Sequence, residues 1–241
     1  MSIIQGTSKA TAGDASFYPF EIGQSLRFDG SSYLSKQWNQ AYTSQTITYS
    51  LWVKFSDLSV TNTVFWAGTS SSDSTNDDAF DFYQNKARIY TNSGNSNNGS
   101  IGSSTALFRD TSSWYHFVMT ADSTNGFRIY VNGGTSPINT VGGFTNHNFN
   151  NNSSYAHIGA QGTSASFKGY MAEINFIDGT ALTPTSFGET KNGVWVPKNP
   201  SGLTYGTNGF RLTFENGIET IGGVANQIRD ESSNSNHWTK N

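Results

Sequence analysis

The chain has 241 residues, no cysteine, a formal net charge of −3 and only 13% charged residues. This charge gives no basic footprint for nucleic acid or another polyanion, and no stretch approaches the roughly 20 apolar residues of a membrane span. Without cysteine, the fold holds neither disulfides nor thiolate metal sites. If Met1 is the natural start, the first residues lack the charged and apolar regions of a signal peptide, so we expect no export by the ordinary secretory route.

The composition favours one large all-β domain. The chain contains 25 Gly and several stretches rich in Asn, Ser and Thr, which suits many strands joined by turns. Its core residues are few but large, because the sequence has 17 Phe, 11 Tyr and 6 Trp while hydrophobic residues make up only 34%. A sandwich of this length need not divide into two domains. No continuous amphipathic helix is evident.

Residues 1–23 are predicted to form an N-terminal arm with little periodicity. Phe17, Tyr18, Pro19 and Phe20 cluster near its end. Two interpretations stay open for this arm, since it could pack on its own domain as a strand or loop, or dock on a neighbouring subunit. Docking would bury aromatic surface that a polar monomer buries poorly, and it predicts a homo-oligomer.

Strands are predicted next at residues 25–34 and 46–55. In the second strand, one face carries Ile47, Tyr49, Leu51, Val53 and Phe55. Period-2 alternation places Trp52 on the other face, together with Thr48, Ser50 and Lys54. An indole on a polar face can stack on a sugar ring or on a partner subunit. The alternative is that a loop covers Trp52.

Residues 114–133 predict a β-hairpin. The first strand, 114–122, is dense in aromatic and β-branched residues. A turn at residues 123–126, Ser-Thr-Asn-Gly, supplies residues that tolerate positive φ. After the turn, Phe127, Ile129 and Val131 alternate with polar residues, so we expect one face toward a core and the other toward water.

A closing strand is predicted at residues 167–176. Alternation assigns Tyr170, Ala172, Ile174 and Phe176 to its apolar face and Met171, Glu173 and Asn175 to the opposite face. On that face Glu173 and Asn175 could hydrogen-bond the hydroxyl groups of a glycan beside Trp52. The alternative is that this polar pair is ordinary surface. Two further strand-like runs follow at residues 193–198 and 205–214.

Taken in order, these segments resemble the concanavalin A-like lectin/glucanase superfamily, which includes laminin-G modules. The hairpin "WYHFVMTAD…FRIYVNGG" is similar to the central hairpin of that family, and residues 25–34, 157–159 and 167–176 are similar to its opening and closing strands. The resemblance implies an antiparallel β-sandwich of the concanavalin A-like jelly-roll type at residues 24–182, preceded by the arm and followed by an extension, 183–241, that packs on it. Function is less constrained, because this fold hosts lectins, glycosidases and adhesion modules.

The segments "SLRFDGSSYL" and "GYMAEINFIDGTALTPTSFGE", with the terminal run 229–238, resemble marine bacteriophage virion proteins more closely than animal laminin modules. This implies a non-enzymatic protein of the virion surface, in capsid decoration or a fibre, made in the host cytoplasm. Its partners would be other virion proteins and host surface glycans, with neither nucleic acid nor membrane insertion. The alternatives are a laminarinase-like glycan hydrolase and a cellular adhesion module, and the missing signal peptide argues against the latter.

Catalysis is not expected. Glycosidases of this superfamily carry a motif similar to E-x-D-x-x-E, in which two carboxylates on one strand act as nucleophile and general acid. The nearest match here is Glu173, Asn175 and Asp178, where an amide replaces the central acid. Asn175 cannot assist its neighbours electrostatically as a carboxylate does. His116 lies between aromatic residues inside a strand, and we expect it to be packed and hydrogen-bonded rather than a general base.

Many members of this superfamily bind calcium, which prefers hard oxygen ligands. Residues 73–78 and nearby Asp81 offer several carboxylates within a short span. In the closing strand, however, Ala172 stands where the family commonly has an Asp before the residue matching Glu173. Two alternatives stay open, a calcium site in this loop and acidic residues that only solvate it. We predict no required cofactor.

Overall fold

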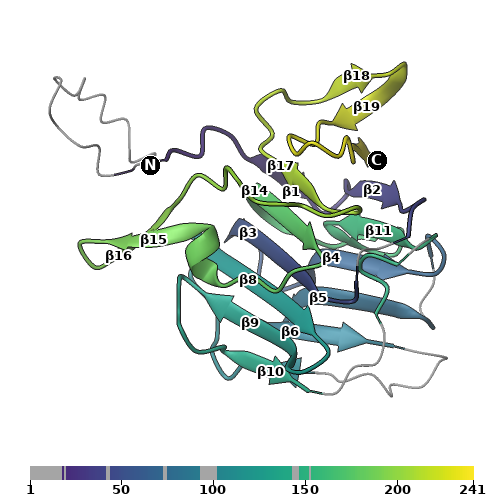
Figure 1. The fold of residues 1–241 in the computed structure, drawn as a ribbon. Helices are drawn as coiled ribbons and strands as arrows, with labels where there is room; N and C mark the ends of the chain where they lie inside the picture. The colour runs from purple at the N-terminus through teal and green to yellow at the C-terminus, as the bar shows by residue number, and fades with distance from the viewer. Residues whose placement is uncertain are drawn as a thin grey trace, which may run out of the picture.

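The computed structural model describes residues 18, 20–41, 44–72, 75–92, 102–142, 147–151 and 153–241. Within these residues the strands form two large antiparallel sheets that pack face to face, which confirms the predicted all-β sandwich (Figure 1). The helical structure of the described chain is one short 3-10 turn, η1 (Pro184–Ser186). No helix in these ranges is long and apolar enough to cross a membrane.

Sheet A contains seven of the described strands. Its order is β1 (Leu26–Asp29), β14 (Lys168–Asp178), β3 (Ile47–Phe55), β8 (Tyr115–Asp122), β9 (Gly126–Val131) and β10 (Asn139–Val141). The seventh strand, β17 (Phe210–Leu212), pairs with the second half of β14, on residues 174–176, whereas β1 pairs with residues 168–171. Both halves of β14 are therefore paired on each side.

Sheet B contains nine of the described strands. Its order is β18 (Glu219–Ile221), β19 (Val224–Ile228), β20 (Trp238–Lys240), β2 (Leu34–Gln37), β11 (Tyr155–Ile158), β4 (Asn62–Gly68), β5 (Asp77–Tyr83), β6 (Lys86–Thr91) and β7 (Gly102–Ser103). Two small hairpins lie outside the main sheets, β12 (Ala160–Gln161) with β13 (Ser164–Ala165), and β15 (Gly188–Lys191) with β16 (Val194–Pro197).

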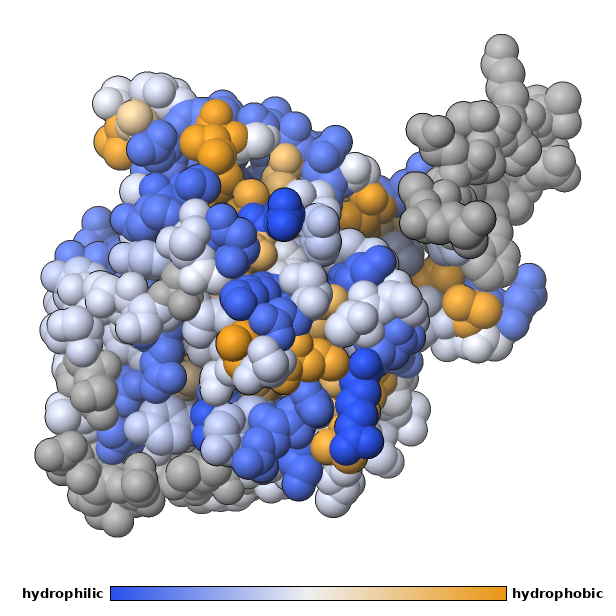
Figure 2. All heavy atoms as spheres, turned by 180° about the vertical axis from the view of Figure 1, so that it is seen from behind, coloured by the Kyte–Doolittle hydropathy of each residue, from blue (hydrophilic) through white to orange (hydrophobic). Residues whose placement is uncertain are grey.

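Aromatic side chains fill the space between the sheets. Tyr49 of sheet A stacks on Phe65 of sheet B with ring centroids 4.6 Å apart, and Phe55 meets Phe82 edge to face at 4.7 Å. The C-terminal residues contribute to the same core, because Phe210 packs on Trp238 at 4.9 Å and both are fully buried. These contacts explain why so few hydrophobic residues suffice. Seen from behind, the surface is mostly hydrophilic, with hydrophobic residues in small groups (Figure 2).

The period-2 predictions for β3 and the central hairpin are confirmed. The predicted inward residues of β3 are all buried in the core, whereas Trp52 and Lys54 point to the outer face of sheet A and are half-buried. In the hairpin, β8 and β9 pair around the predicted turn, and Phe127 and Ile129 are fully buried. This outer face, the side of sheet A that looks away from sheet B, carries the features described below.

The face prediction for β14 is wrong in its first half. Ala172 pairs with Trp52 on the outer face and Met171 is buried in the core, whereas Ile174 and Phe176 face the core as expected. The cause is a β-bulge between residues 172 and 175, where Glu173 adopts a left-handed φ of 44°. A bulge adds one residue to a strand and so exchanges the faces on one side of it.

The predicted C-terminal extension contributes strands to both sheets. Among residues 183–241, β17 joins sheet A and β18 to β20 join sheet B. The arm prediction falls largely outside the described residues, which exclude residues 1–17 and 19. Of the predicted aromatic cluster, the structure therefore places only Tyr18 and Phe20.

Candidate functional site

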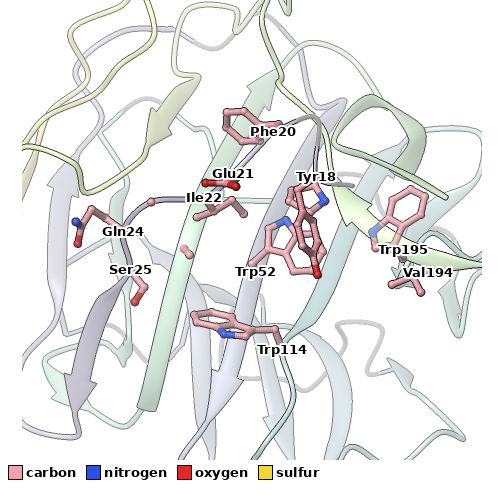
Figure 3. Close-up of a pocket in the computed structure, with 13 residues that line it drawn as sticks. Tyr18, Phe20, Glu21, Ile22, Gln24, Ser25, Trp52, Trp114, Val194 and Trp195 are labelled. Carbon is pink, nitrogen blue, oxygen red and sulfur yellow. The ribbon is translucent and has the colours of Figure 1, made fainter. Parts of the chain in front are cut away.

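A groove of about 740 Å³ lies on the outer face of sheet A, above Trp52 (Figure 3). Trp52 and Ala172, which are cross-strand partners, line it together with Trp114 and Trp195. One wall is formed by Tyr18 and residues 20–25, and the opposite wall by β16. The groove is thus bounded by sheet, hairpin and arm segments that are distant in sequence.

The indole of Trp52 belongs to a stack of three rings. His116, its cross-strand partner on β8, lies against it with ring centroids 4.8 Å apart and an interplanar angle of 29°. Trp195 of β16 lies nearly parallel to this imidazole, with ring centroids 5.9 Å apart and an interplanar angle of 25°. The stack fixes two of the aromatic side chains that line the groove, because His116 itself is completely buried.

Hydrogen bonds determine the tautomer of His116. Trp195 Nε1, which can only donate, lies 3.1 Å from His116 Nδ1, so this nitrogen accepts. Burial lowers the pKa of His116 to about 3, which keeps the imidazole neutral at ordinary pH. The proton is therefore on Nε2, which donates to Ser50 Oγ at 2.9 Å. The prediction that His116 is packed and hydrogen-bonded is confirmed.

Two glycines accommodate the indole of Trp195. A Cβ added at Gly188 would lie 2.4 Å from Trp195 Cζ2, and one at Gly133 would lie 2.1 Å from Cε3. Gly133 also has a φ of +74°, which side chains rarely adopt. The ring of Trp195 consequently lies flat against the β15 and post-β9 backbone.

The N-terminal wall packs on the same chain. Phe20 lies under the guanidinium of Arg211, with Arg211 Cζ 6.0 Å from the ring centroid, and Tyr18 is 38% exposed at the groove. Over residues 20–25 the arm therefore packs on its own domain, which is the first of its two interpretations. Docking on a neighbouring subunit stays a prediction.

Glu173 and Asn175 lie elsewhere on β14 and do not line the groove. They are 5% and 1% exposed, and their polar atoms are engaged within the chain. Arg211 on β17 donates to both oxygens of Glu173, at 2.7 and 3.2 Å. Asn175 Nδ2 donates to Glu173 Oε1 at 3.2 Å, and the hydroxyl of Tyr205 donates to Asn175 Oδ1 at 2.7 Å. Of the three predicted glycan-binding residues, Trp52 alone lies in the groove.

The residues matching the glycosidase motif are not arranged as a catalytic pair. Glu173 lies over the outer face with Arg211, whereas Asp178 pairs in register with the core-facing Ile47. Asp178 accepts hydrogen bonds from Asn150 Nδ2 at 2.8 Å and from the backbone of Asn208 at 3.0 Å, and it is 2% exposed. The two carboxylates therefore do not share a ligand-accessible face.

The acidic segment proposed for calcium is part of β5 and its preceding loop. Asp81 forms an ion pair with Arg88, and Asp77 accepts a hydrogen bond from Trp66 Nε1 at 2.8 Å. Asp78 is buried beneath residue 148, and burial raises its pKa to about 8. Asp73 lies outside the described residues, and within the described chain no three His, Cys, Asp or Glu side chains gather as a metal site requires.

Sequence reasoning missed Trp114, Trp195 and Tyr18 as groove residues. Each lies at a strand end or in a peripheral segment, and their convergence depends on packing between distant parts of the chain. The signal available was the indole itself, because Trp195 lies in a short strand, "GVWVP", next to the turn residues Asn192 and Gly193. The alternation that places Trp52 on the outer face of β3 places Lys54 on that face as well.

Comparison with solved structures finds the same fold over most of the chain. A candidate carbohydrate-binding protein from Bacteroides ovatus superposes with a TM-score of 0.62 at 17% identity, covering 90% of this chain and 58% of that chain. This chain therefore spans little more than half of that protein. Domain 4 of an extracellular arabinanase from Geobacillus stearothermophilus, solved with arabinotriose, has a TM-score of 0.53 at 19% identity and covers 69% of this chain and 75% of that domain.

A heptameric pentraxin from Limulus polyphemus has a TM-score of 0.50 at 18% identity, covering 68% of this chain and 80% of that chain. A search of curated protein sequences finds no match. Residues 28–186, well over half of the chain, match the sequence profile of a family described as the concanavalin A-like lectin/glucanases superfamily. The chain belongs to this family.

Proposed function

We propose that this protein is a non-enzymatic carbohydrate-binding domain and that the groove above Trp52 is its binding site. The observation that carries the proposal is the clustering of Trp52, Trp114, Trp195 and Tyr18 around one open groove. Aromatic rings of this kind offer apolar faces to the C–H surfaces of sugar rings. The stack on His116 holds Trp52 and Trp195 in place before a ligand arrives, which lowers the entropic cost of binding.

The absence of catalysis is supported by the composition of the groove. Of the described residues that line it, Glu21 is the single carboxylate, and hydrolysis of glycosidic bonds ordinarily requires two. Glu173 and Asp178 lie outside the groove. The similar structures agree with binding, since one is a candidate carbohydrate-binding protein and another was solved with arabinotriose. Because these relatives are distant in sequence, they support the proposal through the fold alone.

The biological setting that we propose is the surface of a bacteriophage particle. There the domain would decorate the capsid or form part of a fibre, as a homo-oligomer in contact with other virion proteins, and would bind host surface glycans. The support is the likeness of its sequence segments to virion proteins. Mass spectrometry of purified particles, with immunogold labelling of this chain, tests the location. A chain found in the infected cell and never on particles would contradict it.

The binding site is tested with Trp52→Ala on glycans that a microarray identifies for the native protein. We expect affinity to fall roughly tenfold to hundredfold, because an aromatic side chain contributes about 1.5 to 3 kcal/mol when fully buried. Isothermal titration calorimetry measures the loss. Tyr83→Ala is the matched control, since Tyr83 is 45% exposed on sheet B, away from the groove. Equal affinity in Trp52→Ala and the native protein, or release of reducing sugar, would overturn the proposal.

A further inference from the structure

A row of three side chains continues the groove along the outer face of sheet A. Arg27 of β1 pairs with Tyr170 of β14, and Tyr170 pairs in turn with Lys54 of β3. Cross-strand partners project from the same face, so the phenol ring lies between two cations. Adjacent strands are about 4.8 Å apart, which separates the backbones of Arg27 and Lys54 by roughly 10 Å.

This row, Arg27–Tyr170–Lys54, lies directly beside the groove. Tyr170 and Lys54 are each two residues along their strands from Ala172 and Trp52, which corresponds to about 7 Å. Trp114 connects the two features, because it lines the groove and its ring centroid is 6.5 Å from that of Tyr170. The separation matches roughly one sugar unit beyond the ring that would stack on Trp52.

The two cations lack the partners that neighbouring cations have. Within the described chain, the side chains of Arg27 and Lys54 form no ion pair, hydrogen bond or cation–π contact. On the same sheet, Lys168 is paired with Asp57 at 3.0 Å and Arg211 is paired with Glu173 at 2.7 Å. Arg27 is exposed, and Lys54 and Tyr170 are partly exposed.

We propose that this row binds an acidic substituent, a carboxylate or a sulfate, on the sugar next to the one that stacks on Trp52. The ligand class is therefore an acidic glycan rather than a neutral one. The inference rests on the proposed glycan-binding function of the groove. A guanidinium and an ammonium on either side of an aromatic ring can contact a planar or tetrahedral anion while the sugar ring rests on the phenol.

The net charge of −3 does not conflict with this assignment. Whole-chain charge predicts binding to long polyanions, whereas an acidic substituent on one sugar responds to charges within about 10 Å, the screening length at ordinary ionic strength. The carboxylate that lines the groove, Glu21, belongs to the arm segment, whereas the other labelled side chains around it are uncharged (Figure 3). The groove thus suits an uncharged ring and the row suits an anionic one.

Affinity electrophoresis through gels containing laminarin, polygalacturonate or κ-carrageenan tests the proposal. These polymers present a neutral glucan, a carboxylated glycan and a sulfated glycan, so the two acidic gels separate the two anion types. The row variant is Arg27→Gln with Lys54→Gln. The matched control is Lys86→Gln with Lys240→Gln, which also removes two positive charges, but from sheet B. Trp52→Ala is run in parallel as the variant of the groove.

We expect an acidic polymer to retard the native chain more than laminarin does, and the row variant to bind that polymer about threefold to tenfold more weakly at low salt. The control should keep native retardation. The acidic-glycan assignment is overturned if the row variant binds every acidic polymer that the native chain binds with the same affinity. It is also overturned if the control variant loses as much affinity as the row variant. In both cases the proposal that the groove binds glycans still stands. No retardation in any gel, or retardation unchanged in Trp52→Ala, contradicts the glycan-binding function itself.

Discussion

The two halves of β14 present opposite kinds of outer surface. In the second half, Glu173 and Asn175 are covered by β17 and Tyr205, and their hydrogen-bonding groups are occupied. In the first half, Tyr170 is partly exposed beside Lys54, and the buried Ala172 forms part of the groove floor beside Trp52. The half with the more polar residues is thus the closed one. Accessibility, more than the chemical character of the residues, decides which half can bind.

The covered half can be opened by removing the side chain that closes it. Arg211→Ala would leave the buried carboxylate of Glu173 without its bidentate partner, and we expect a loss of about 3 kcal/mol in the free energy of unfolding. Arg229→Ala is the matched control, because its ion pair with Glu219 is more exposed and solvent screening should make its contribution much smaller. Urea denaturation measures both. Similar losses in the two variants would mean that the Glu173 pair behaves as a surface pair.

The two halves of β14 also show how much of the structure the sequence alone could predict. Alternation placed Trp52 on the outer face correctly because β3 is regular from Ile47 to Phe55. In β14 the bulge at Glu173 reverses the faces, and because the period-2 pattern carries no sign of a bulge, alternation assigns Ala172 and Met171 to the wrong sides. Local periodicity predicts the core well and fails wherever one residue is added to a strand.

The groove was harder to predict than the core for a related reason. Trp52 is joined there by Trp195 and Tyr18, which are far away in the chain and meet only through packing of the β15–β16 hairpin and the arm. The closure of Glu173 likewise depends on Arg211, from a strand outside the resemblance that identified the fold. A sequence pattern reports the residues within one element, whereas binding sites depend on which elements cover which.

The role of the open half in binding can be tested by displacing Trp195, which forms part of one wall of the groove. Gly188→Ala would place a methyl group 2.4 Å from the indole of Trp195, so the ring must move from its position beside His116. We expect glycan affinity to fall roughly threefold to tenfold, equivalent to about 1 kcal/mol, with little change in overall fold. Titration calorimetry measures the affinity, and near-ultraviolet circular dichroism reports the displaced indole.

Glu189→Ala is the control for this experiment, because it alters the same strand without adding atoms against Trp195. If Gly188→Ala binds as the native protein does, then Trp195 is not a working wall of the groove. The open half would in that case be reduced to Trp52 and its neighbours on the sheet.

The smallest expected effect concerns the buried imidazole beneath the open half. Burial lowers the pKa of His116 to about 3, below the ordinary value of 6.5 for the unfolded chain. The unfolded state therefore binds a proton first as pH falls, so the stability supplied by neutral His116 is complete above pH 6.5 and is lost progressively from there toward pH 3. At pH 5.5, one unit below the unfolded pKa, the loss is roughly 1 kcal/mol.

His116→Gln isolates this effect, because an amide can accept from Trp195 and donate to Ser50 without titrating. Burial also perturbs other groups, since it lowers the pKa of His147 to about 4 and raises that of Asp78 to about 8. Those groups titrate in both proteins and cancel in the difference between them. We expect the native protein's stability relative to His116→Gln to shrink by roughly 1 kcal/mol between pH 7.5 and 5.5, as measured by urea denaturation at each pH. A difference that stays constant over this range would show that His116 is not held neutral by burial, and the rigid stack inferred beneath the open half would lose its electrostatic basis.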